Sequence, residues 1–68
     1  MTCHHWTDLT ELVDRHDDWN EQQTMRLWLE AIECHDLKEE VTHETYFFLQ
    51  GGHPLLFAMD HAMQVHGL

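Results

Sequence analysis

Residues 45–59 read TYFFLQGGHPLLFAM, and the break at Gly51-Gly52-His53-Pro54 decides how the rest of the chain is interpreted. Glycine just past a helix end allows the left-handed backbone that closes many helices, and proline suits the first turn of the next helix. A short connection of this kind joins antiparallel neighbours. We therefore predict a C-terminal helical hairpin, with arms at about Leu37–Gln50 and Pro54–His66, and with Gly67 as its stop.

The two arms differ in how clearly they show a buried face. The second arm carries an apolar stripe at helical spacing, made of Leu55, Ala58, Met59, Ala62 and Met63. On the first arm, one face combines Leu37, Val41 and Phe48 with the charged Glu44. Its other apolar residues point elsewhere, namely Tyr46, Phe47 and Leu49. The end of this arm is therefore apolar nearly all round.

Two more helices are predicted before the hairpin, at about Asp8–His16 and Glu21–His35. The pairs Asp8/Glu11 and Asn20/Gln23 have the spacing of a capping box, which marks a helix start. On the first of these helices, one face is formed by Leu9, Leu12, Val13 and His16. No stretch alternates polar and apolar residues at period two, so we expect no strands.

The helix predicted at 21–35 is apolar over an unusually broad arc of about 220°, roughly twice what one neighbouring helix can cover. The arc comprises Met25, Leu27, Trp28, Leu29, Ala31, Ile32 and Cys34. Asp36 and Glu39 again form a capping-box pattern, which places a break near His35-Asp36. Because no Gly or Pro occurs from Asn20 to Gln50, one continuous helix over that stretch stays an alternative.

The predicted fold is a single all-α domain over residues 1–68, a small bundle of three to four helices with a flexible segment at 1–7. At 68 residues the chain is too short to bury a large core, and its apolar arcs exceed what one copy can cover. We therefore expect a homodimer with two-fold symmetry. The residues assigned to the core or the dimer interface are Leu27, Trp28, Ala31, Ile32, Phe47, Phe48, Leu55 and Met59.

Several classes of protein are excluded by simple features. No apolar run reaches membrane-spanning length, so no contact with a membrane is expected. The start MTCHHW lacks the basic and apolar regions of a signal peptide. We therefore expect a cytoplasmic protein in which Cys3 and Cys34 are free thiols. The formal net charge of -10, with histidine neutral, argues against direct binding of nucleic acid.

The charge is unevenly spread along the chain. Eleven of the 13 acidic residues lie within residues 1–40, together with all 3 basic ones. Residues 41–68 hold only Glu44 and Asp60, with no lysine or arginine. An acidic half and a nearly neutral, aromatic-rich half indicate two surfaces with different tasks. Such acidity steers a basic partner, imitates the phosphates of nucleic acid or serves only solubility, and all three interpretations stay open.

The partner-binding surface is predicted around the turn between the first two helices. Trp19 stands between charged stretches where burial is difficult, and tryptophan is enriched among residues that dominate binding energy. Tyr46 has a hydroxyl to satisfy and is expected at a boundary with water. The predicted partner-binding residues are Asp14, Asp17, Asp18, Trp19, Glu21 and Tyr46.

No motif in the chain indicates catalysis, and we expect neither an enzyme nor a cofactor. Cys34 paired with a nearby histidine is conceivable as a nucleophile, but a chain of this size has little room for a cleft. The 8 histidines suggest a metal site, yet the Cys3-His4-His5 and Cys34-His35 groups match no zinc spacing. No metal ligand is therefore assigned. A small histidine-rich protein that responds to metal or pH is kept as the alternative function.

In length, net charge and its acidic helical stretch Asp8–Glu40, the chain resembles the small acidic proteins with which temperate phages disable host machinery. Anti-CRISPR proteins, DNA mimics and anti-quorum-sensing proteins belong to that class. The resemblance implies a stoichiometric inhibitor or modulator of a host protein, such as a DNA-binding regulator or a nucleic-acid-handling complex. The second half, rich in Phe, Leu and Met, differs from a pure DNA mimic and favours a mixed apolar and acidic docking surface.

Overall fold

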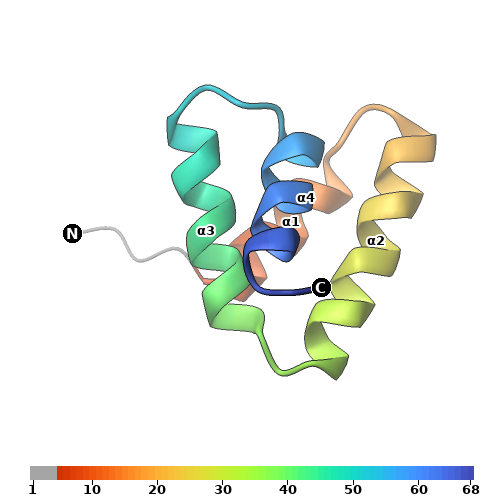
Figure 1. Ribbon diagram of the computed structural model, residues 1–68. Coiled ribbons are helices and arrows are strands. Elements are labelled where there is room, and N and C mark those ends of the chain that lie inside the picture. The colour runs from red at the N-terminus through yellow and green to blue at the C-terminus, as the bar shows by residue number, and fades with distance from the viewer. Residues whose placement is uncertain (1–4) are drawn as a thin grey trace.

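The protein, seen in a computed structural model that describes residues 5–68, is a bundle of four helices (Figure 1). Their bounds are α1 Trp6–Asp14, α2 Trp19–Cys34, α3 Lys38–Gln50 and α4 Leu55–Val65. The described part of the chain contains no strand. The α1–α2 and α3–α4 connections lie at one end of the bundle, and the α2–α3 connection lies at the other. The all-α prediction and its C-terminal hairpin are confirmed.

Helices α2, α3 and α4 end in the same local structure, in which one residue after the helix has a left-handed backbone conformation. These residues are Asp36 (φ 57°), Gly52 (φ 92°) and Gly67 (φ 78°). After α2, the Leu37 N–H donates to the Ile32 carbonyl at 3.1 Å, and after α3 the His53 N–H donates to the Phe48 carbonyl at 3.2 Å. This is the Schellman motif. The break near His35-Asp36 is thus confirmed, and a continuous helix over 20–50 is wrong.

The helix starts lie one to three residues from the predicted caps. Asp18, not Asn20, caps α2, because its side chain accepts a hydrogen bond from the Glu21 N–H at 3.0 Å. At α1 the cap is His5, whose N–H donates to the Asp8 carboxylate at 3.2 Å, so Asp8 is the third helical residue. Leu37 stands at the cap of α3 in place of Asp36, and Pro54 precedes α4 instead of opening its first turn.

Because α1 begins at Trp6, the prediction of a flexible segment over residues 1–7 is wrong for its last two residues. Trp6 and Thr7 belong to the helix, whereas residues 1–4 of that segment, Cys3 and His4 among them, lie outside the described residues.

Every helix contributes to the core. Its buried members are Leu9, Val13, Met25, Leu29, Ile32, Val41, Met59, Ala62 and Met63. The stripe predicted on α4 is buried except for Leu55, which is half-buried.

The buried face of α3 differs from the predicted one. Val41, Thr42 and Thr45 are buried, whereas Glu44 and Phe48 are only half-buried. The buried residues of α4 include Ala58 and Ala62, and α3 and α4 make the most extensive helix contact in the bundle. Short side chains allow two helix axes to approach closely. A face of threonines was not predicted because threonine counts as polar in a hydrophobic pattern.

The two buried threonines differ in how their hydroxyl groups are satisfied. The Thr45 hydroxyl donates to the Val41 carbonyl at 2.7 Å, one turn earlier on the same helix. The Thr42 hydroxyl is equally buried but has no hydrogen-bond partner among residues 5–68. A buried polar group without a partner costs stability. The buried face of α3 therefore carries one unsatisfied polar group.

Candidate partner-binding surfaces

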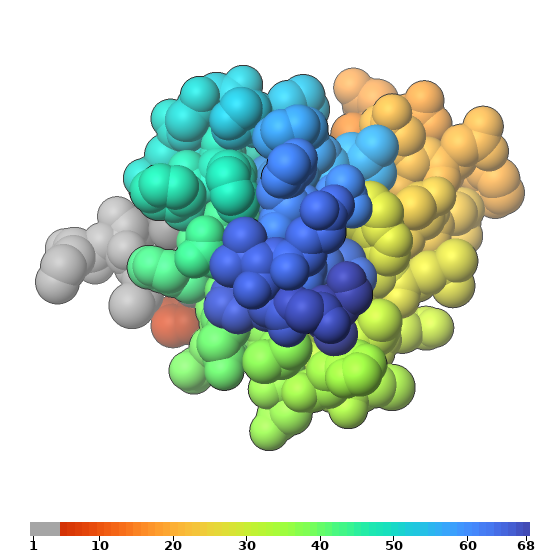
Figure 2. Space-filling view, viewed as in Figure 1, coloured from red at the N-terminus to blue at the C-terminus, as the bar shows by residue number. Residues whose placement is uncertain are grey.

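The turn between α1 and α2 presents a group of five predicted partner-binding residues, which we call the α1–α2 corner. It consists of Asp14, Asp17, Asp18, Trp19 and Glu21, and it lies at the upper right of the molecule, in orange (Figure 2). The Gln22 side chain holds the turn in place, because its amide donates to the carbonyls of Val13 at 3.0 Å and Asp14 at 2.8 Å. The corner is therefore a fixed structure.

Three of the four carboxylates at the corner also have structural partners. Asp14 pairs with the Arg26 guanidinium at 3.1 Å, and Glu21 lies 2.6 Å from the His16 ring nitrogen. Asp18 caps α2. Acidic residues at a helix N-terminus also interact favourably with the helix dipole. Part of the acidity therefore serves the fold of the corner itself.

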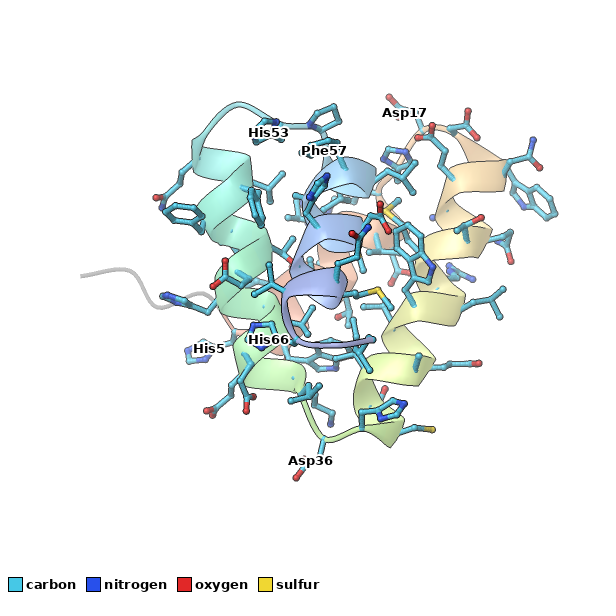
Figure 3. The ribbon with its side chains drawn as sticks, viewed as in Figure 1. His5, Asp17, Asp36, His53, Phe57 and His66 are labelled. Carbon is cyan, nitrogen blue, oxygen red and sulfur yellow. The ribbon has the colours of Figure 1, made fainter. Side chains whose placement is uncertain are left out.

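Trp19 and Asp17 have no such structural role. The Trp19 side chain is 69% exposed, although it opens α2. Asp17 is exposed and makes no hydrogen bond or ion pair with another described residue. Its side chain points outward at the end of the bundle that also carries His53 and Phe57 (Figure 3). An exposed tryptophan beside several carboxylates can contact both apolar and cationic groups of a partner.

Tyr46 lies apart from the corner. It is half-buried and packs against the core. Burial raises the pKa of its phenol above the ordinary value of 10.0, and the negative charges of Asp8 and Glu11 on α1 raise it further. Of the predicted partner-binding residues, Tyr46 is thus the one that the fold separates from the others. It connects α3 to the rest of the bundle.

The raised pKa of Tyr46 can be measured directly because it is the only tyrosine. We expect phenolate absorbance to titrate above pH 10.0 in the folded protein and at a lower pH in the denatured chain. Tyr46 then contributes stability below its unfolded pKa, and this contribution is lost as pH rises through the folded pKa.

A variant separates the two causes of this shift. Glu11→Gln should lower the pKa of Tyr46 without removing the whole shift, since burial is the larger cause. Equal titration midpoints in the folded and denatured protein would show that the fold does not raise the pKa of the phenol, which would contradict the described burial of Tyr46 near Asp8 and Glu11.

Of the eight residues predicted for the core or the dimer interface, Phe48 is half-buried, and the other seven divide into three groups. Ile32 and Met59 are fully buried. Trp28, Ala31 and Leu55 are partly buried and pack against the core. Leu27 and Phe47 are exposed, at 66% and 64%, and so lie outside the core. Of the broad apolar arc on α2, only Met25, Leu29 and Ile32 are buried, and Cys34 is an exposed free thiol.

A second surface, which sequence reasoning did not predict as a unit, lies at the end of the α3–α4 hairpin. We call it the aromatic–histidine cluster, and it comprises Phe47, Phe48, His53, Phe57 and His61. The Phe57 ring lies 4.6 Å from the His53 ring and 4.0 Å from the His61 ring, measured between centroids. The spacing of His53, Phe57 and His61, four residues each, is the signal that indicates such a column.

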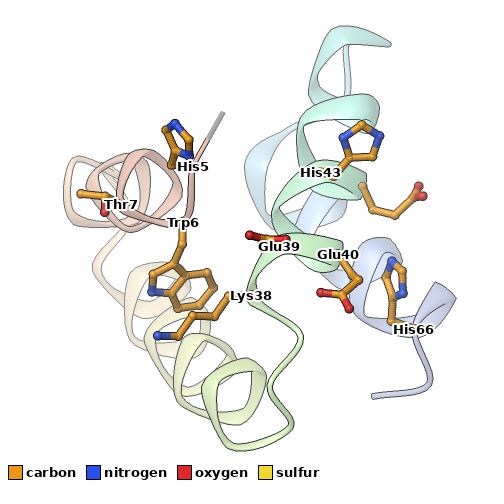
Figure 4. A pocket seen from close by; sticks show the side chains of 9 residues that line it. His5, Trp6, Thr7, Lys38, Glu39, Glu40, His43 and His66 are labelled. Carbon is orange, nitrogen blue, oxygen red and sulfur yellow. The ribbon is translucent and has the colours of Figure 1, made fainter. Parts of the chain in front are cut away.

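An open groove lies between the start of α1, the first half of α3 and the end of α4 (Figure 4). Its lining includes His5, His43 and His66 with Glu39, Glu40 and Glu44. The Lys38 ammonium lies 5.8 Å from the centre of the Trp6 ring at the same place. Within residues 5–68, no three His, Cys, Asp or Glu side chains are arranged to hold a metal ion.

No protein-family model, curated protein or solved structure matches the chain. Over the described residues, none of the helices combines the length and apolar character needed to cross a membrane.

Proposed function

We propose that the protein acts without catalysis, by binding a host protein through the α1–α2 corner and inhibiting or modulating it. The observation that carries this proposal is the fixed turn that exposes Trp19 beside four carboxylates. A complementary partner is a protein with a basic surface, such as a DNA-binding regulator or a nucleic-acid-handling complex in the cytoplasm. This is the mode of action of the small acidic phage proteins that the chain resembles.

The two parts of the corner have different tasks in this mechanism. The carboxylates accelerate encounter, because long-range attraction raises association rates by about 10- to 1,000-fold at low salt. Trp19 then slows dissociation, since buried aromatic anchors dominate binding energy at interfaces. The surplus of acids in residues 1–40 extends the attraction beyond the corner.

The test compares two triple variants after the partner has been captured from a host lysate with the wild-type protein. Asp14→Asn, Asp17→Asn and Asp18→Asn remove three charges from the corner, and asparagine preserves the cap at position 18. We expect the association rate to fall about tenfold at low salt and to lose most of its salt dependence. Stopped-flow or surface-based kinetics with the captured partner measures this rate.

The matched control removes the same net charge elsewhere, through Glu30→Gln, Glu39→Gln and Glu40→Gln, which are all exposed. It should retain most of the association rate. If both triple variants slow association equally, only the overall charge matters and the corner is not the docking surface. Trp19→Ala should raise the dissociation rate while circular dichroism stays unchanged, and an unaltered dissociation rate would also contradict the proposal.

A further inference from the structure

We draw no further inference here: the strongest candidate, the open groove between α1, α3 and α4, is a cluster of the acidic side chains Glu39, Glu40 and Glu44 with no second observation among residues 5–68 that points to a ligand, because the nitrogen without a hydrogen-bond partner beside them belongs to His66, whose side chain is only half-buried.

Discussion

Leu9→Ala is expected to remove most of the folded population or to lower the thermal midpoint by more than about 10 °C. Leu9 is fully buried on α1 and belongs to the core. Truncating a buried leucine costs about 2–5 kcal/mol, through lost burial and the cavity that is left. A domain of this size has a total stability of about 3–10 kcal/mol. The loss is therefore comparable with the whole free energy of unfolding.

The same substitution at Leu27 provides the control. Leu27 lies on α2 with 66% of its side chain exposed, so Leu27→Ala removes little buried surface. We expect its free energy of unfolding to stay within about 0.5 kcal/mol of the wild type. Urea denaturation followed by circular dichroism measures both variants, and equal losses at the two positions would contradict the described packing of α1.

Thr42→Val is expected to stabilise the protein by about 1–2 kcal/mol. The Thr42 side chain is 1% exposed, and its hydroxyl has no hydrogen-bond partner among the described residues. Valine keeps the shape and replaces the unsatisfied hydroxyl with a methyl group. For a domain of 60–100 residues, each kcal/mol raises the thermal midpoint by about 4–8 °C. Thermal unfolding by circular dichroism measures the shift.

Thr45→Val is the matched comparison, because Thr45 is fully buried on the same helix but its hydroxyl donates to the Val41 carbonyl. That variant loses a hydrogen bond worth about 0.5–1.5 kcal/mol, so it should be neutral or less stable than the wild type. The difference in stability between the two variants therefore measures the contribution of the hydrogen bond that the Thr45 hydroxyl donates. Equal stabilisation by both would show that the hydrogen bond from Thr45 to Val41 contributes nothing to stability.

The helices were predictable because their signals are local. Gly52 and Gly67 end two helices at residues where the backbone is left-handed, and the stripe from Ala58 to Met63 is apolar on one face. The caps were harder to place, since Asp17, Asp18 and Asn20 are all good candidates next to one another. The choice of Asp18 depends on which carboxylate reaches the Glu21 N–H, and the spacing of residues does not decide this.

The candidate surfaces were predictable in composition but not in arrangement. The exposure of Trp19 followed from its charged neighbours. The pairing of Asp14 with Arg26 depends on the angle between α1 and α2, which no local pattern encodes. In the same way, Phe48 meets His61 only because α3 and α4 pack in one particular register. The buried face of α3 includes two threonines, which a hydrophobic pattern counts as polar.

The methionines of the core have a consequence for the chemistry of the chain. Met25, Met59 and Met63 are all buried, so their thioethers are shielded from oxidants while the bundle is closed. Oxidation turns a methionine into a polar sulfoxide, which a packed interior does not accommodate. Each oxidation event must therefore wait for an opening of the bundle and then hinders its closure. The rate at which these three methionines are oxidised is thus set by how often α2 and α4 separate from the core, whereas the exposed Cys34 thiol needs no such opening.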